Sequence, residues 1–277
     1  MIINHNLNAM NSHRQMGMNN NSAAKAMEKL SSGLKINRAG DDAAGLAISE
    51  KMRGQIRGLD MASKNSQDGI SLIQTAEGAL TETHAILQRM RELTVQAGNK
   101  GTNEAEDLQA IQDEITELIG EIDGIAGRTQ FNGKNLLDGS YAAGTADLTF
   151  QIGANATQQM TLNIGNMNAT TLTVDTVDVS DPAMFDFDTE VAKIDAAINT
   201  VSAQRSALGA NQNRLEHTIK NLDVSSENLQ AAESRIRDTD MAKSMMEFTR
   251  SNILNQASQA MLAQANQQPQ AVLQLLR

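Results

Sequence analysis

The sequence contains no cysteine and no tryptophan, and its only aromatic residues are one tyrosine and five phenylalanines. The missing cysteine excludes disulfide bridges, thiol nucleophiles and thiolate metal sites. With so few aromatic side chains, a core must be built from Leu, Ile, Met and Ala, which suits long helices packed side by side. Only Pro182 and Pro269 occur in 277 residues, so little interrupts a helix.

Basic residues are also scarce in the middle of the chain. The net charge is −10, and the stretch from Asn135 to Ala192 contains no lysine or arginine. A nearly neutral body with an acidic middle argues against nucleic acid as a partner, because phosphate binding needs a basic face. Long apolar runs are missing too, so we expect no membrane span and no secretory signal peptide; an exported chain would leave by another route.

What the sequence does contain is heptad periodicity. One column recurs every seven residues: Leu208, Leu215, Leu222, Leu229 and Ile236. A second set alternates spacings of three and four: Leu108, Ile111, Ile115, Leu118, Ile122 and Ile125. A third run has Leu59, Ile70, Ile73, Leu80 and Leu87, with Ser66 and Thr94 in the same column. These spacings predict three long helices in a slender coiled-coil bundle, one of them running from about Ala43 to Gln96. At ~1.5 Å per residue that helix would be on the order of 80 Å long, so we expect an elongated rod.

The middle of the chain changes character. Residues 148–152 and 160–164 alternate apolar and polar side chains around a glycine-containing loop, which predicts a β-hairpin. Residues 170–179 are rich in Thr and Val but also contain acids, and helical pattern resumes near Thr189. The fold class predicted is therefore mainly α, with a small β-hairpin region.

Both ends of the chain carry weaker amphipathic stripes. The first includes Leu7, Met10 and Leu30, and the second includes Leu254 and Met261. Isolated helices of this quality are marginal in water. We therefore expect both ends to be poorly ordered in the monomer and to become helical only when packed against other copies.

No catalytic or metal-binding constellation is evident. The sequence has no nucleotide-binding glycine loop, no G-x-S-x-G and no H-E-x-x-H. His84 and His217 could pair across two helices to hold a metal, but neither has a ligand partner at suitable spacing on its own helix. Asp41 and Asp42 could act as paired carboxylates, although capping of the helix that begins at Ala43 already explains them. We expect no enzyme activity, no cofactor and no metal.

Several long motifs resemble the bacterial flagellins. The N-terminal signature is MEKLSSGLKINRAGDDAAGLAI at residues 27–48, followed by DGISLIQTAEGAL at 68–80 and TQFNG at 129–133. The C-terminal signature is AAESRIRDTDMA at residues 231–242 and QQPQAVLQLLR at the end. The similarity covers nearly the whole chain, in the style of short Bacillus-like flagellins.

The resemblance implies a domain organisation. Residues 1–42 and 239–277 would form the inner domain D0, and residues 43–165 and 190–238 would form the surrounding domain D1. Residues 166–189 would be a short, acidic, surface-exposed connection in place of the variable outer domains of larger family members.

The resemblance also implies a function. The chain would be the structural subunit that polymerises into the flagellar filament, outside the cell, after export through the flagellar type III channel. Its partners would be other copies of itself, an export chaperone, the cap and the hook-junction proteins, with no nucleic acid and no membrane. The expected polymerisation residues are apolar positions of the two ends: Leu7, Met10, Leu30, Leu254, Met261, Val272, Leu273, Leu275 and Leu276.

A further implication concerns a vertebrate Toll-like receptor, which recognises many flagellins around a Q-R-x-R-E-L motif. The predicted surface consists of Gln88, Arg89, Glu92 and Leu93, with Glu114 as acidic partner on the next helix. Arginine is enriched among interface hot spots, so Arg89 would be the anchor. The alternative is that the same residues serve packing between neighbouring protofilaments; both roles are compatible.

Three rival functions stay open at this point. A hook–filament junction protein would share the terminal patterns but agree less closely throughout. Some flagellins carry a peptidase in the variable insert, but no histidine lies between His84 and His217 to form a zinc motif. A membrane-surface amphipathic protein would need a cationic face.

Overall fold

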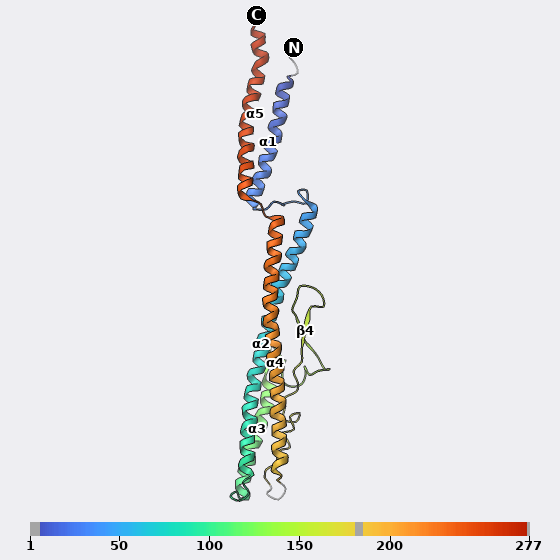
Figure 1. Ribbon diagram of the computed structural model, residues 1–277, viewed down its shortest axis with the longest axis vertical. Helices are drawn as coiled ribbons and strands as arrows, with labels where there is room; N and C mark the ends of the chain where they lie inside the picture. Colours follow the sequence, from blue (N-terminus) through green and yellow to red (C-terminus); the bar gives the residue numbers. More distant parts are fainter. Residues whose placement is uncertain (1–5, 181–184, 276–277) are drawn as a thin grey trace. The chain divides into compact units, whose positions relative to one another are not determined.

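The computed structural model describes residues 6–180 and 185–275, and this part of the chain is mainly helical (Figure 1). The helices are α1 (Leu7–Ser32), α2 (Ala43–Ala97), α3 (Ala105–Arg128), α4 (Phe187–Arg237) and α5 (Met241–Leu275). The strands are β1 (Gln130–Phe131), β2 (Lys134–Asn135), β3 (Leu148–Gln151) and β4 (Gln159–Leu162). The predicted fold class is confirmed, and the predicted helix from Ala43 to Gln96 corresponds to α2 almost to the residue.

The chain divides into two compact units. The terminal unit comprises residues 1–54 and 227–277, and the central unit comprises residues 55–226. Helices α2 and α4 therefore contribute to both, while α1 and α5 belong to the terminal unit alone. The large hydrophobic core lies within residues 72–215, entirely inside the central unit.

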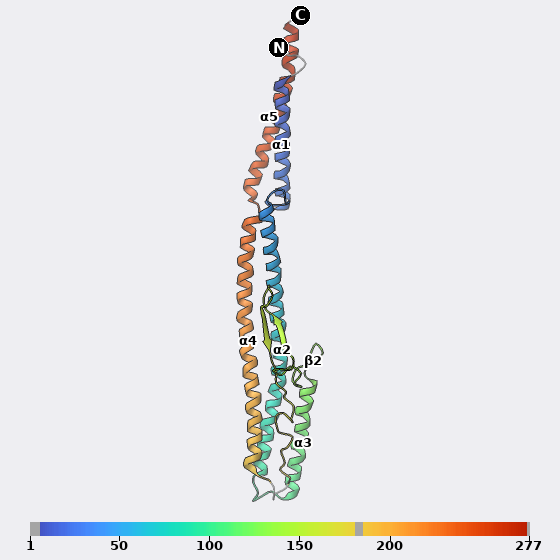
Figure 2. The same ribbon diagram turned by 90° about the vertical axis from the view of Figure 1, so that its right-hand side faces the viewer.

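The core of the central unit is the seam predicted from the heptads, with α2, α3 and α4 running side by side (Figure 2). Leu80 and Leu87 from α2, Ile115 from α3 and Leu208 and Leu215 from α4 have no exposed side-chain surface. Burial of this apolar stripe provides the main stabilisation of each helix, since intrinsic propensity alone is a weak contribution.

Two polar side chains occupy the same buried column of α2. Ser66 and Thr94 are fully buried, and their hydroxyls donate hydrogen bonds to the carbonyl oxygens of Ala62 and Met90, four residues earlier, at 2.8 Å. Because the donors are satisfied within the helix, these residues fill heptad positions without leaving an unpaired polar group.

Helices α2 and α4 are antiparallel in the central unit. The Ser226 hydroxyl donates to Asp60 at 3.0 Å, the Ser63 hydroxyl donates to Asp223 at 3.2 Å, and Arg91 pairs with Asp195 at 2.7 Å. As residue numbers rise along α2, those of the partners fall along α4. These polar contacts flank the leucine seam and fix its register.

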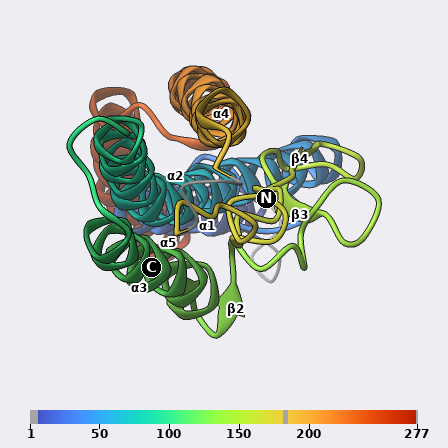
Figure 3. The ribbon, with the colours of Figure 1, turned by 90° about the horizontal axis from the view of Figure 1, so that it is seen from below.

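Two antiparallel hairpins complete the central unit. Strands β1 and β2 are joined by Asn132 and Gly133, which both have positive φ angles, as a tight two-residue turn requires. Strands β3 and β4 pair from Leu148–Leu162 to Gln151–Gln159, which confirms the hairpin predicted from the alternating pattern. Figure 3, which looks along the helices, shows the strands beside the helices rather than between them.

The loop of the β3–β4 hairpin rests against α2. The Asn65 amide donates to the carbonyl of Gln151 at 3.3 Å, and a Cβ atom at Gly58 would lie 2.8 Å from the Cβ of Ala154. Glycine at position 58 therefore permits an approach that a side chain would block.

The described part of the acidic connection, residues 166–180 and 185–189, is partly buried against the central unit. Its described carboxylates face solvent, but apolar side chains between them are buried in the core: Met167, Ala169, Leu172, Val174, Val177, Val179 and Phe185. The backbone of this segment is held by Asp123, which accepts from Ala169 N at 2.8 Å, and by Gln112, which accepts from Val179 N. The alternation of buried apolar and exposed polar side chains therefore anchors this segment to the helices, although the segment forms no strand in its described part.

The central seam gives a first prediction. Leu87→Ala removes a fully buried side chain between helices, so we expect it to lower the free energy of unfolding by about 2–5 kcal/mol. Val224→Ala, at an exposed position of α4, serves as the control and should change it by less than about 0.5 kcal/mol. Urea unfolding of dilute monomer measures both; equal effects would show that Leu87 is not part of the core.

Candidate functional site

The terminal unit is built around an antiparallel pair of helices, α1 and α5, which lie side by side (Figures 1 and 2). The Asn6 amide donates to the carbonyl of Ala265 at 2.7 Å, and the Asn255 amide donates to the side chain of Asn20 at 3.0 Å. At the other end of the pair, α1 stops at Gly33, whose left-handed backbone forms its C-cap.

The buried side of this pair is small and polar. The residues with the least exposed surface in α1 and α5 are Ala23, Ala26, Ser244, Ser251, Asn255 and Ala265. The Oδ1 atom of Asn255 has no hydrogen-bond partner among the residues that the structure describes. Burial of alanines, serines and an amide contributes far less stabilisation than burial of leucines.

Most of the large apolar side chains that the structure describes in these two helices face outward. The exposed ones are Leu7, Met10, Met18, Met27, Met241, Met245, Met246, Ile253, Leu254 and Met261. Within one chain the pair is therefore inverted relative to an ordinary helix packing, because its apolar surface is outside. An exposed apolar surface of this extent marks a site of association.

The structure places the predicted polymerisation residues on this apolar surface where it describes them. Leu7 is 71% exposed, Met261 is 65% exposed, Met10 and Leu254 are exposed, and Leu30 is half-buried. Three further residues, Val272, Leu273 and Leu275, lie in α5, but the description does not extend to their side chains, and Leu276 lies outside the described residues.

Sequence reasoning missed two features of the terminal unit. The exposed residues Met246 and Ile253 were not part of the predicted stripe, because α5 carries apolar residues on more than one side and has no single amphipathic face. The two ends were expected to pack against other copies, whereas the structure pairs them within one chain. Their gain of order on assembly stays a prediction.

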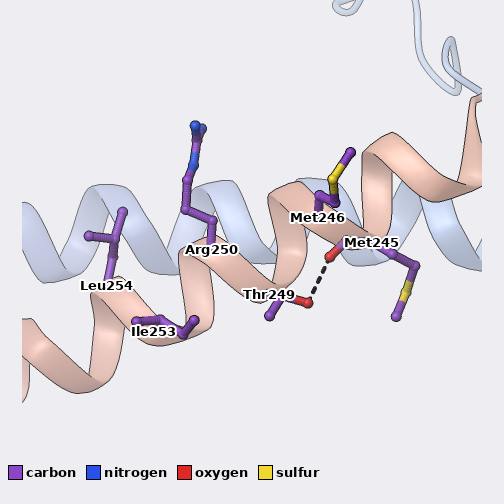
Figure 4. Close-up of a pocket in the computed structure, with 6 residues that line it drawn as sticks. All are labelled: Met245, Met246, Thr249, Arg250, Ile253 and Leu254. Atoms are coloured by element: carbon purple, nitrogen blue, oxygen red, sulfur yellow. Dashed lines mark hydrogen bonds between the residues drawn. The ribbon is translucent and has the colours of Figure 1, made fainter.

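Part of the exposed apolar surface of α5 is a shallow groove. Its lining consists of Met245, Met246, Thr249, Arg250, Ile253 and Leu254. Met246 and Arg250 project to one side of α5 and Met245 projects to the other (Figure 4). The Thr249 hydroxyl is already used, since it donates to the carbonyl of Met245 at 2.8 Å.

The connections that lead into α1 and α5 are paired with each other. Leu34 and Asp238 form an antiparallel bridge, in which Lys35 N donates to the carbonyl of Arg237 at 2.6 Å and Thr239 N donates to that of Gly33 at 3.0 Å. Ile36, next to this bridge, is buried. Both chain connections are thereby held together at one point of the terminal unit.

The paired carboxylates Asp41 and Asp42 have local structural roles. Asp42 accepts from Gly45 N at 2.9 Å and so caps α2, as the sequence predicted. Asp41 accepts hydrogen bonds from the backbone N–H groups of Arg38 and Asn37, and these bonds hold the pKa of Asp41 below its ordinary value. Both acids are thus engaged with backbone donors.

The second predicted surface lies on the central unit. Arg89 donates to Glu114 of α3 at 2.9 Å and to Glu92 at 3.3 Å, and these hydrogen bonds raise the pKa of Arg89 above its ordinary value. Gln88 is also exposed and bonds His84 at 3.0 Å. Leu93, the remaining residue of the predicted surface on α2, is only 2% exposed and packs in the core of the free chain.

The remaining chemical possibilities gain no support. Across residues 6–180 and 185–275, no three His, Asp or Glu side chains gather in a way that could hold a metal ion. No helix in the same part of the chain is both long and apolar enough to cross a lipid bilayer. The outward apolar side chains of the terminal unit are therefore the main candidate site.

Comparison with known proteins identifies relatives along the full chain. Residues 3–142 match the family described as the bacterial flagellin N-terminal helical region, and residues 191–276 match the bacterial flagellin C-terminal helical region. A flagellin of Bacillus subtilis (strain 168) is 65% identical and one of Halalkalibacterium halodurans is 63% identical, each with 100% of both chains covered. The crystal structure of Bacillus cereus flagellin is 36% identical, with a TM-score of 0.50 over 61% of this chain and 94% of that one.

Proposed function

The chain belongs to the bacterial flagellin family, and from this premise we propose that its terminal unit supplies the contacts by which copies assemble. As a flagellin it is a structural, non-enzymatic protein, the extracellular subunit of the flagellar filament that serves motility. The full-length agreement with flagellins disfavours the alternative of a hook–filament junction protein.

The observation that carries the proposal is the inversion of the α1–α5 pair. Its interior is made of small and polar residues, while large apolar side chains such as Leu7, Met246 and Met261 are exposed. Burying these side chains against further copies would release roughly 1.5–3 kcal/mol for each one fully removed from water. We therefore infer that the pair reaches its full stability only in the polymer.

Assembly by this surface would be heterologous. One face of α1 and α5 meets a different face on the next copy, which generates an open helical polymer instead of a closed ring. Because much of the stabilisation of the terminal helices comes only from neighbours, the free subunit would stay monomeric until it reaches the growing end. In this proposal residues 1–42 and 239–277 form the inner domain, D0. Residues 43–165 and 190–238 form the surrounding domain, D1, and residues 166–189 take the place of the variable outer domains.

The same exposed surface suggests how the other expected partners act. An export chaperone would cover the apolar residues of α5 before passage through the type III channel, and cap and hook-junction proteins would bind the same helices at the filament ends. Each of these partners would present an apolar face to residues such as Leu254 and Met261, which are exposed in the free chain.

A pair of substitutions tests the proposal. Leu254→Gln with Met261→Gln keeps side-chain size but makes two exposed apolar positions polar. We expect the critical concentration for assembly to rise at least about tenfold, with the circular dichroism of the monomer unchanged. Sedimentation and negative-stain microscopy after salt-induced assembly measure it.

The matched control keeps both positions apolar. Leu254→Met with Met261→Leu should assemble close to the unsubstituted level, because buried apolar area is nearly conserved. If the glutamine variant grows filaments as readily as this control, the apolar surface of α5 does not drive assembly.

A second role is favoured by the side chains around Arg89. Its guanidinium group joins Glu92 and Glu114 on adjacent helices, with Gln88 exposed beside it. We infer that this set, without Leu93, is the surface that a vertebrate Toll-like receptor would recognise on the free subunit. In the filament the same polar set would contact a neighbouring protofilament.

A further inference from the structure

We propose that the exposed methionines of α5, above all Met245, Met246 and Met261, form a reversible oxidation site through which peroxides block assembly. The inference rests on the proposed function, because it assigns a chemical control to the same apolar surface. The reagent would be a two-electron oxidant of the peroxide class, and the product would be methionine sulfoxide.

Methionine exposure differs sharply between the two units. Seven described methionines of the terminal unit are exposed: Met10, Met18, Met27, Met241, Met245, Met246 and Met261. In the central unit, Met90, Met160 and Met167 are buried, and Met61 is exposed. Because oxidation follows access to the thioether, the reactive sulfurs are concentrated on the assembly surface, while the buried ones provide internal references.

Two of these methionines, Met245 and Met246, line the groove on α5 and are accessible to an oxidant. Met246 is 66% exposed and Met245 is half exposed, and they project to opposite sides of the helix (Figure 4). Arg250 lies on the same side as Met246, one helical turn later. A sulfoxide oxygen at Met246 could accept a hydrogen bond from this guanidinium, which would stabilise the oxidised side chain in its solvent-exposed position.

The chemical step is balanced without any further component. A lone pair of the thioether sulfur attacks one peroxide oxygen, the O–O bond breaks, and an S–O bond forms. The departing oxygen takes up the proton that the transferred oxygen loses and leaves as water or an alcohol. The sulfur loses two electrons and the peroxide gains them.

Oxidation would change what the groove can bury. Thioethers pack well in apolar contacts, whereas a sulfoxide carries a polar oxygen that needs a hydrogen-bond partner. At Met246 the Arg250 guanidinium would hold that oxygen on the solvent side, away from an apolar contact, and at Met245 the Thr249 hydroxyl cannot serve as donor while it donates to the carbonyl of Met245. An oxidised subunit would therefore add to a filament at least about tenfold more slowly. Methionines already buried between copies would be protected.

The experiment compares monomer with filament. Both are exposed to hydrogen peroxide, and peptide mass spectrometry follows the oxidation of each methionine. We expect Met245, Met246 and Met261 to react in the monomer and to be protected in the filament, while Met90 and Met160 react slowly in both. Equal reactivity of the α5 methionines in monomer and filament would overturn the proposal.

The functional arm measures seeded growth of peroxide-treated monomer. We expect growth to slow at least about tenfold and to recover after treatment with methionine sulfoxide reductases. In Met245→Leu/Met246→Leu/Met261→Leu, peroxide should leave growth unchanged relative to the same variant without treatment. The control Met61→Leu should stay sensitive. Undiminished growth of treated monomer, or no recovery after reduction, would contradict the inference. The truncation argued below tests the assembly role without peroxide, so the two ideas can fail separately.

Discussion

A chain that ends at Ile253 should remain a soluble, helical monomer and grow no filaments where the full chain assembles. The truncation removes the second half of α5, including the exposed side chains of Leu254 and Met261. Without them, α5 loses two of the exposed apolar side chains that it offers to other copies, and the polymer loses contacts in every subunit.

The rest of the molecule should tolerate this loss. Every residue of the large core lies between positions 72 and 215, far from the removed segment in sequence and in the other unit. The truncation does break hydrogen bonds between α5 and the α1 segment: Asn6 loses its acceptor, the carbonyl of Ala265, Asn19 loses its acceptor Ser258, and Asn20 loses its donor Asn255. We therefore expect α1 to lose helicity along with the removed residues.

The measurements are sedimentation, electron microscopy and circular dichroism, with urea unfolding of the central unit as the internal reference. Its midpoint should match that of the full chain. Removal of residues 1–20 is the reciprocal variant, since it deletes the same hydrogen bonds from the side of α1. Filaments formed by either truncated chain would show that the α1–α5 pair is dispensable for assembly.

The helical core of the central unit could be predicted from the sequence, because the residues that recur at heptad spacing are also the ones that are buried. Leu208, Leu215 and Leu80 occupy heptad columns and are fully buried, so period alone located the seam. A second heptad column of α2 is hard to recognise from hydropathy. Its residues Ala76, Thr83, Met90 and Ala97 also recur every seven residues and are buried. It was overlooked because two alanines and a threonine give little hydropathy signal.

This second column also explains why Leu93 is buried while its neighbours in the motif are exposed. Positions 73, 76, 80, 83, 87, 90, 94 and 97 form one continuous buried seam with spacings of three and four. Leu93 lies beside that seam, whereas Arg89 and Glu92 face solvent. A short motif read as one surface ignores that a helix turns by about 100° per residue.

The terminal unit was less predictable for a physical reason. Hydropathy identifies apolar side chains that are expected to be buried. In α1 and α5 many of these side chains are exposed in the single chain, and Ser251 and Asn255 are buried instead. The partner of each apolar residue would be another molecule, and one sequence holds no record of that contact. Similarly, the acidic residues of the connection at 166–189 predict an exposed segment, whereas its buried valines hold it against the helices of the central unit.

The surface around Arg89 gives the second large effect. We expect Arg89→Gln to reduce activation of the Toll-like receptor by the monomer on the order of tenfold or more, because a truncated arginine anchor removes charge-assisted hydrogen bonds at the contact. Its unfolding midpoint should be close to that of the unsubstituted chain, since Arg89 is exposed and its ion pairs are solvated. A receptor reporter assay and urea unfolding measure the two properties.

Two further variants separate recognition from folding. Arg128→Gln removes another exposed arginine that is paired with a glutamate of its own helix, Glu121, and it should leave the receptor response unchanged. Leu93→Ala, unlike Arg89→Gln, should destabilise the chain. It should lower the free energy of unfolding by about 2–5 kcal/mol, because it opens a cavity in the core. If Arg89→Gln and Arg128→Gln reduce the receptor response equally, the response depends on net positive charge and not on the surface around Arg89. If Leu93→Ala lowers the response while leaving stability intact, Leu93 contacts the receptor and its assignment to the core is wrong.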